Sequence, residues 1–151
     1  MTGIILSGCN GKMGRAVTLC VDGMQDYEIV CGIDIYTETP NSYPVYSSPM
    51  LIPQEIAEKA NVIIDFSNAS AVPELLAYCV EKQVPCVLCT TGLSVELTEE
   101  VSKASEKVAM LKSANMSLGI NLLMKLAVYL IKKGYTKKKG KNINESDQKA
   151  I

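Results

Sequence analysis

The sequence predicts an α/β fold in which a doubly wound parallel sheet forms a single domain. Short apolar runs alternate with stretches in which apolar residues recur every three or four positions, the spacing of amphipathic helices. A glycine-rich turn joins the first run to the first such stretch. With 151 residues, 48% of them hydrophobic, the chain is long enough for one core. Strands that alternate with helices imply right-handed crossovers and a sheet covered on both faces.

The elements are expected in the following order along the chain. Apolar runs predict strands at about residues 3–7, 27–33, 62–66, 85–89 and 108–111, with a short extended piece at 45–46. Helical spacing predicts helices at about residues 12–22, 54–59, 70–83, 94–107 and 118–133. Four prolines between residues 40 and 53 predict a loop before the second helix. The domain is therefore expected to span residues 1–133, followed by a Lys-rich, disordered tail at 134–151.

Three glycines stand between the first strand and the first helix, spaced G-x-x-G-x-x-G. In a nucleotide-binding βα unit, Gly8 allows the sharp turn, Gly11 lets the backbone approach a pyrophosphate, and Gly14 lets the helix pack on the sheet. The free N–H groups and the dipole of the helix then face the phosphates. Lys12 lies in the first turn beside the loop, so it is better placed than Arg15 to neutralise phosphate charge. Both residues also suit a solvated helix face. Because any tight turn can carry glycines, the motif needs support from its context.

That context includes Asp34, which ends the second predicted strand 20 residues after Gly14. A Rossmann unit places a carboxylate there to accept hydrogen bonds from the adenosine ribose. The alternative is a loop residue or a helix cap. Asp34 is followed by Ile35 rather than by a cation, so nothing adjacent offsets its repulsion of a 2′-phosphate. We therefore expect NADH to be preferred over NADPH.

The carboxyl ends of the other strands are expected to share one rim, where parallel sheets bind their ligands. The rim comprises residues 8–14, Asp34, 65–67, 89–92 and 114–116. The Thr-Thr-Gly at 90–92 can supply hydroxyls and N–H groups, or it is a plain βα turn. Asn115 can offer an amide to a nicotinamide or to a substrate amide, or it is a turn residue.

Charge and cysteine usage exclude other classes of protein. Residues 1–131 hold 8 Lys+Arg against 14 Asp+Glu, which argues against nucleic acid as the partner, and the 7 lysines of residues 132–151 suit a solvated tail. No basic segment precedes the first strand, so we expect a cytoplasmic protein whose six cysteines are small buried hydrophobes. Cys86 and Cys89 would face opposite sides of a strand, and the chain has no histidine, so no metal site is expected.

Four blocks together resemble one family. G-C-N-G-K-M-G at 8–14 resembles its G-x-x-G-x-M-G loop, D-F-S at 65–67 its I-D-F-S/T, and C-T-T-G at 89–92 its G-T-T-G. S-A-N-M-S-L-G-I-N-L-L at 113–123 resembles its A-x-N-F/M-S-x-G-x-N-L-L. The family is 4-hydroxy-tetrahydrodipicolinate reductase, an NAD(P)H-dependent enzyme of lysine and diaminopimelate biosynthesis. The resemblance covers about residues 1–135.

The resemblance implies a role for each matching position. The pyrophosphate would lie along Gly8, Cys9, Asn10, Gly11, Lys12 and Met13, and the ribose would bind Asp34. The nicotinamide side would comprise Cys89, Thr90, Thr91, Ser113, Ala114, Asn115 and Met116. Cys89 replaces a glycine of the family pattern, so its thiol either crowds the cofactor or points away from it.

The chain departs from the family after residue 133. There the family continues into a second domain with an H-H-x-x-K-x-D-A-P-S-G-T-A segment, which carries the proton donor and substrate-binding groups. This chain has no such segment and no catalytic residue is assigned. We therefore expect a cofactor-binding fragment that cannot turn over alone, as a truncated or frame-shifted reading frame would give. The alternative is a non-catalytic nucleotide-binding or subunit-interaction module.

The predicted helix at 118–131 is apolar nearly all round, with Lys125 its one charge. It is shorter than the about 20 apolar residues that span a membrane. An uncovered apolar face promotes association. We therefore expect the chain to self-associate, or to pair with a homologue, through residues 118–131.

Overall fold

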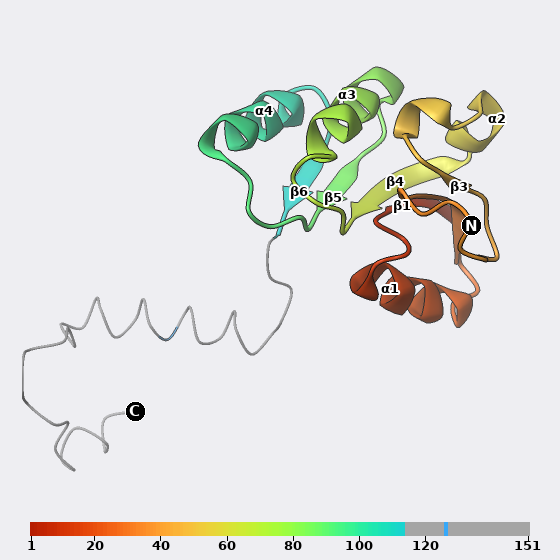
Figure 1. The fold of residues 1–151 in the computed structure, drawn as a ribbon. Coiled ribbons are helices and arrows are strands. Elements are labelled where there is room, and N and C mark those ends of the chain that lie inside the picture. Colours follow the sequence, from red (N-terminus) through yellow and green to blue (C-terminus); the bar gives the residue numbers. More distant parts are fainter. Residues whose placement is uncertain (114–125, 127–151) are drawn as a thin grey trace, which may run out of the picture. The chain divides into compact units, whose positions relative to one another are not determined.

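The computed structural model describes residues 1–113 and Leu126. Their centre is a six-stranded sheet in which every neighbouring pair is parallel, in the order β3-β2-β1-β4-β5-β6 (Figure 1). This order is that of the doubly wound Rossmann fold and confirms the predicted fold class. The strands are β1 Thr2–Ser7, β2 Tyr27–Ile33, β3 Val45–Tyr46, β4 Ala60–Asp65, β5 Cys86–Leu88 and β6 Met110–Lys112.

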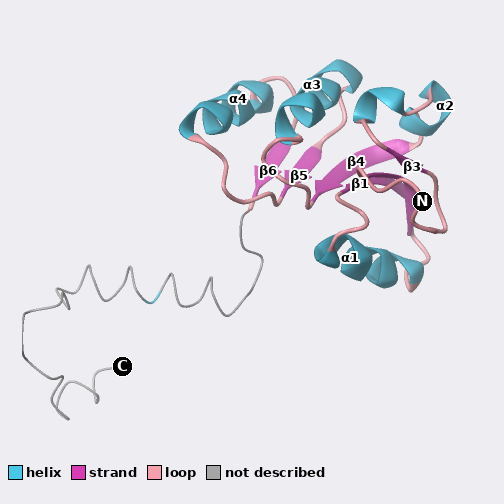
Figure 2. Cartoon of the chain, in the orientation of Figure 1, coloured by secondary structure: helices cyan, strands magenta, loops and turns pink. Residues whose placement is uncertain are grey.

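Helices lie on both faces of the sheet, as expected. Figure 2 shows α1 on one face and α2, α3 and α4 on the other. The helices are α1 Lys12–Asp22, α2 Gln54–Ala57, α3 Val72–Lys82 and α4 Val95–Ser105, with a 3-10 helix, η1, at Pro49–Leu51. The side chain of Ser94 caps α4 by accepting a hydrogen bond from the Leu97 N–H.

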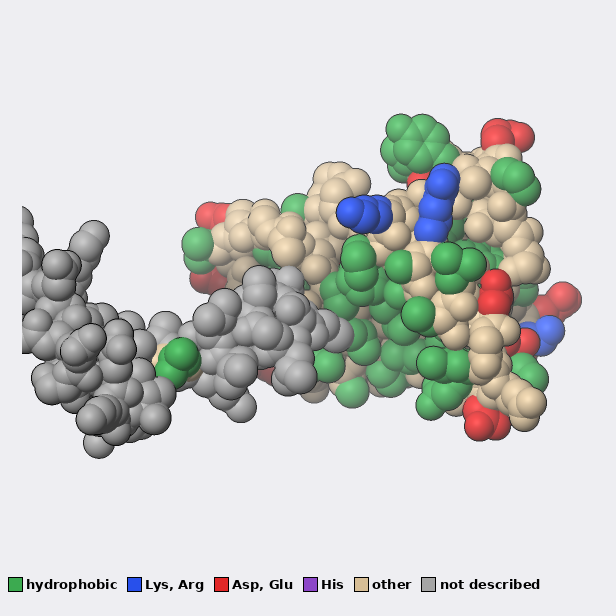
Figure 3. Space-filling view, turned by 90° about the horizontal axis from the view of Figure 1, so that it is seen from below, with side chains coloured by type: hydrophobic (Ala, Val, Ile, Leu, Met, Phe, Trp, Pro, Cys, Tyr) green, Lys and Arg blue, Asp and Glu red, His purple; other side chains and the backbone are tan. Residues whose placement is uncertain are grey.

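The main core lies between the sheet and the face covered by α2, α3 and α4. The central strands contribute Ile5, Ile63 and Leu88, which are fully buried, and the helices add Leu75 and Val101. Burial of each such side chain contributes about 1.5–3 kcal/mol, so this face dominates the stability of the sheet. On the opposite side α1 is the described helix, and Figure 3 shows hydrophobic side chains gathered on that side.

The start of β1 is irregular, because its register shifts against both neighbouring strands. At the shift against β4, the side-chain oxygen of Asn61 accepts the N–H of Gly3 at 2.8 Å in place of a backbone carbonyl. A Cβ on Gly3 would lie 2.1 Å from the carbonyl oxygen of Lys59. The close approach therefore requires glycine at residue 3.

Some predicted features lie outside the described residues. They are the helix at 118–133, the domain boundary at 133 and the disordered tail at 134–151. These features stay predictions. Within the part of the chain that the structure describes, no helix combines the length and apolar character needed to cross a membrane.

Candidate functional site

The glycine turn between β1 and α1 is so tight that Gly8 and Gly14 leave no room for a side chain. Gly8 has φ +74°, in the left-handed region, and a Cβ there would lie 2.6 Å from the carbonyl oxygen of Phe66. A Cβ on Gly14 would lie 2.2 Å from the carbonyl oxygen of Gly8. Gly11 is the N-cap of α1 and no side chain caps the helix. The first N–H groups of α1 therefore receive no side-chain cap, which is the arrangement of helix N-termini that bind anions.

A cavity of about 340 Å³ lies beside this turn, at the carboxyl ends of β1, β2 and β4. Four of the predicted site residues line it: Gly8, Asn10, Gly11 and Asp34. The structure thus brings the glycine turn and the strand-end carboxylate to one cavity. The other lining residues are Ser7, Ile33, Ile35, Tyr36, Ser47, Phe66, Ser67, Asn68 and Ala71.

Asp34 is half-buried and is held by backbone groups on both sides. Its Oδ2 accepts the N–H of Asn10 at 2.9 Å, and its Oδ1 accepts the N–H of Tyr36 at 3.1 Å. A carboxylate has about four lone-pair sites, so these two bonds leave room for two more donors. Asp34 is therefore fixed in place and still able to accept bonds from a diol in the cavity.

The end of β5 is tied to the end of β4 by a buried carboxylate. Asp65 is fully buried, and its Oδ2 accepts the hydroxyl of Thr90, which is also buried. Its Oδ1 accepts the N–H of Ser67 at 3.2 Å. The hydroxyl of Thr90 is therefore used inside the protein, whereas the neighbouring Thr91 is exposed on the rim.

Two predicted site cysteines are buried. Cys9 is 0% exposed and packs with Leu6 and Tyr43, so it offers the site only backbone groups. Burial, and then the charge of Asp34, raises the pKa of the Cys9 thiol to about 11. Cys89 is also buried, with Sγ 4.0 Å from the carbonyl oxygen of Val87, and burial raises its pKa. Of the two alternatives for Cys89, the structure has the thiol turned inward.

The remaining predicted site residues are not gathered at the cavity. Lys12 and Met13 are exposed at the start of α1, outside the lining of the cavity. Ser113 follows β6 and donates its N–H to the carbonyl oxygen of Leu88. Ala114, Asn115 and Met116 lie outside the described residues. The structure therefore describes the turn side of the predicted site more fully than the nicotinamide side.

Several lining residues carry no motif in the sequence. Ile35 and Tyr36 directly follow Asp34, and both side chains are exposed although they are large and apolar or aromatic. Their exposure beside a strand-end carboxylate is visible only in the fold. Phe66 and Ser67 were placed on the rim without a role, and they line the cavity. No group of three or more His, Cys, Asp or Glu suited to a metal ion occurs among residues 1–113.

The sheet order, the glycine turn and the carboxylate at the end of β2 define the Rossmann class of dinucleotide-binding domains. Comparison with known families narrows this class. The family described as "Dihydrodipicolinate reductase, N-terminus" matches residues 2–116. The chain belongs to this family, as its four sequence blocks predicted.

Individual relatives agree with the family. The chain is 40% identical over 135 residues to a 4-hydroxy-tetrahydrodipicolinate reductase of Clostridium tetani, a match that covers 89% of this chain and 51% of the relative. The enzyme of the same name from Caldanaerobacter subterraneus subsp. tengcongensis is 42% identical over 126 residues, covering 83% and 48%. The dipicolinate-bound dihydrodipicolinate reductase from Paenisporosarcina sp. TG-14 superposes with a TM-score of 0.71 at 25% identity, over 86% of this chain and 53% of that one. The chain thus spans about half the length of the curated relatives it matches.

Proposed function

We propose that the chain binds a nicotinamide dinucleotide as the cofactor-binding part of a 4-hydroxy-tetrahydrodipicolinate reductase. The observation that carries this proposal is the cavity beside the glycine turn, which has Gly8, Gly11 and Asp34 in its lining. In a Rossmann domain the first two approach the pyrophosphate, and the carboxylate accepts the ribose hydroxyls. Membership of the dihydrodipicolinate reductase family supports this particular enzyme among those that use a Rossmann domain.

The predicted site residues form two groups, one for each half of the cofactor. The backbone of Gly8, Cys9, Asn10, Gly11, Lys12 and Met13 would face the pyrophosphate, and Asp34 the adenosine ribose. Cys89, Thr90, Thr91, Ser113, Ala114, Asn115 and Met116 would lie along the nicotinamide. The bound nicotinamide would supply the hydride, while the protein holds and orients it. Buried Asp65 would serve the second half by fixing Thr90 and Ser67.

This chain is proposed to bind the cofactor without turning over substrate by itself. It contains no histidine, and it lacks the H-H-x-x-K segment that its resemblance assigns to proton donation. A turnover assay with reduced cofactor and freshly prepared substrate tests this. A rate of about 1 per second or more, ordinary for an enzyme, would contradict it.

The cofactor is proposed to be NADH in preference to NADPH. Asp34 would repel a 2′-phosphate, and Ile35 after it carries no charge. Arg15 and Glu38 both line a second cavity, of about 550 Å³, so the negative charge of Glu38 offsets the attraction of Arg15 for a 2′-phosphate. Calorimetric titrations of both cofactors decide the preference, and equal or tighter binding of NADPH would refute it.

The compartment proposed is the cytoplasm. All six cysteines are free, which suits a reducing environment.

The alternative function is a non-catalytic nucleotide-binding or subunit-interaction module. It is distinguished from the reductase part by measuring cofactor affinity with and without substrate. Cofactor affinity that is unchanged by substrate would favour the module.

A further inference from the structure

Asn10, the second residue of the turn after Gly8, uses all four of its polar groups inside the protein. Its N–H donates to Asp34 at 2.9 Å, and its carbonyl oxygen accepts Nε of Arg15 at 3.1 Å. Its side-chain Nδ2 donates to the carbonyl oxygen of Tyr36 at 2.6 Å, and its Oδ1 accepts Nδ2 of Asn41 at 3.0 Å. Asn10 therefore joins the glycine turn to both ends of the segment 36–41.

The segment 36–41 has few other attachments. Tyr36 is 67% exposed, and most of its neighbours up to residue 40 are also exposed. The loop is fastened again only further on, where Tyr43 is buried and its hydroxyl lies 2.7 Å from that of Thr18. Within residues 1–113, the side-chain hydrogen bonds that reach segment 36–41 from the glycine turn come from Asn10.

Cavities lie on both sides of this connection. The cavity of about 340 Å³ that contains Asp34 and a second of about 550 Å³ share Asn10, Ile35 and Tyr36 in their linings. A cofactor whose ribose is held by Asp34 must place the attached adenine within a few ångströms of that residue. The exposed side chains of Ile35 and Tyr36 are the apolar surface available there.

We propose that Asn10 is a positioning residue that holds segment 36–41 against the glycine turn and so forms the adenosine subsite before the cofactor binds. The proposal rests on the proposed function, because it assigns the subsite to the adenosine half of the dinucleotide. A subsite that is already ordered spares the ligand the cost of ordering the loop. Asn10 thus acts through Tyr36 and Asn41 rather than by touching the phosphates with its side chain.

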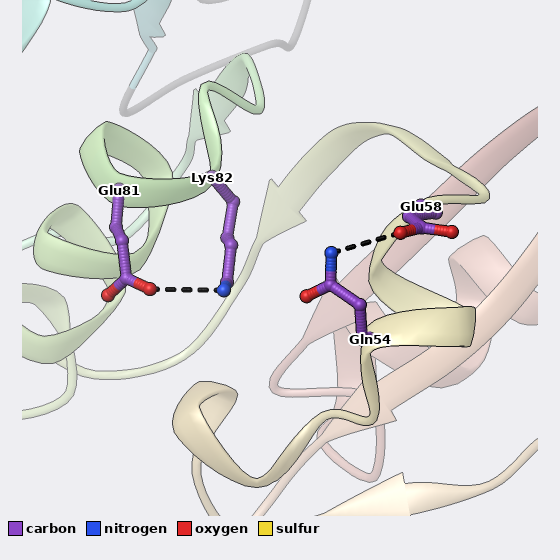
Figure 4. Close-up of polar contacts among 4 residues, drawn as sticks. All are labelled: Gln54, Glu58, Glu81 and Lys82. Atoms are coloured by element: carbon purple, nitrogen blue, oxygen red, sulfur yellow. Dashed lines mark hydrogen bonds and ion pairs between the residues drawn. The ribbon is translucent and has the colours of Figure 1, made fainter.

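The test compares the whole chain with Asn10→Ala and Asn41→Ala. Gln54→Ala is the matched control, because it also removes a side-chain amide. That amide donates to the carboxylate of Glu58 at 3.0 Å across α2, away from the cavity (Figure 4). Amide hydrogen exchange is measured without ligand, and ADP-ribose binding by calorimetry. Asn10→Ala should speed exchange in segment 36–41 but not in β4 or β5. It should weaken ADP-ribose binding about tenfold, which corresponds to about 1.4 kcal/mol.

Asn41→Ala removes one of the two bonds to Asn10, together with its own bond to the carbonyl oxygen of Thr39 at 3.0 Å inside the segment. Its effect on ADP-ribose binding should be smaller than that of Asn10→Ala, and the double variant should fall short of the sum of the two because both act through one connection. If Asn10→Ala unfolds the chain, Asn41→Ala carries the same test. Unchanged exchange in segment 36–41, or ADP-ribose affinities that match the native and Gln54→Ala chains, would overturn the proposal. If the native chain binds no ADP-ribose, the proposed function fails, and the exchange data still decide whether Asn10 holds the loop.

Discussion

Replacing Asp34 with Ala tests the most specific contact in the proposed cofactor site. The native carboxylate accepts two backbone N–H groups, from Asn10 and Tyr36, and keeps room for two ribose hydroxyls. The change removes all four interactions but leaves Gly8 and Gly11 in place. Cofactor affinity should therefore fall while the fold persists.

The size of the effect follows from these bonds. A hydrogen bond to a charged group contributes about 1.5–3 kcal/mol, and the lower value suits a half-buried carboxylate. Loss of two ribose bonds then costs about 3 kcal/mol, or roughly 150-fold in the dissociation constant of NADH. By the same value, loss of the two loop bonds should lower the free energy of unfolding by about 3 kcal/mol. NADPH should lose less affinity than NADH, because the variant no longer repels the 2′-phosphate.

The assay is calorimetric titration of NADH and NADPH into native, Asp34→Ala and Asp26→Ala chains. Asp26 is exposed in the loop before β2, so its replacement controls for the loss of one negative charge. A urea melt of each chain separates loss of binding from loss of folding. NADH affinity within about threefold of native in Asp34→Ala, well below one hydrogen bond to a charged group, would refute the assignment of this carboxylate to the ribose.

Four further predictions concern stability, thiol reactivity, pH dependence and association. Tyr78 is buried and its hydroxyl has no hydrogen-bond partner among the described residues, so Tyr78→Phe should leave the free energy of unfolding equal or raise it by about 1 kcal/mol. Tyr43→Phe loses the bond to Thr18 and should lower the free energy of unfolding by about 1 kcal/mol. A urea melt in which the Tyr78→Phe chain is less stable than the Tyr43→Phe chain would contradict this. At pH 8 a thiol reagent should modify one cysteine quickly, the exposed Cys20, and the other five only on unfolding. Burial raises the pKa of Cys9 to about 11 and that of Cys31 to about 12, from an ordinary 9.0. The protonated thiols therefore stabilise the fold below pH 9. Urea melts should show that this stability is lost as the pH rises through 11 to 12. Residues 118–131 should make the chain self-associate, and a monodisperse monomer in light scattering at micromolar concentration would speak against it.

Much of the fold was predictable because its signals are local. The bounds predicted for α1, β2 and β3 coincide with those observed, since apolar periodicity and turn residues mark them within the sequence itself. The 3-10 helix η1 was missed, because its three residues are too few to show a period. The predicted helix at 54–59 is shorter in the structure, where α2 ends at Ala57.

The site was predictable where a motif fixes the backbone and not where side chains meet across the fold. Asp34 could be assigned to the same site as the glycines, because it ends a predicted strand 20 residues after Gly14. The bonds from Asn10 to Tyr36 and Asn41 join residues 26 and 31 positions apart, and no periodicity records such a contact. Likewise, Cys9 is buried where it packs with Tyr43, and the thiol of Cys89 lies beside the carbonyl oxygen of Val87. Sequence patterns therefore located the cavity and four of its lining residues, but not the contacts that hold those residues in place.

In the proposed complex, the adenosine and pyrophosphate half of a nicotinamide dinucleotide occupies the cavity between the glycine turn and Asp34. Backbone amide chemical shifts of the labelled chain, followed during addition of NADH, measure this occupancy residue by residue. We expect saturable shifts at Gly8, Gly11, Tyr36 and Asn68, with little change along α4. Shifts confined to other surfaces, or none at millimolar NADH, would contradict it.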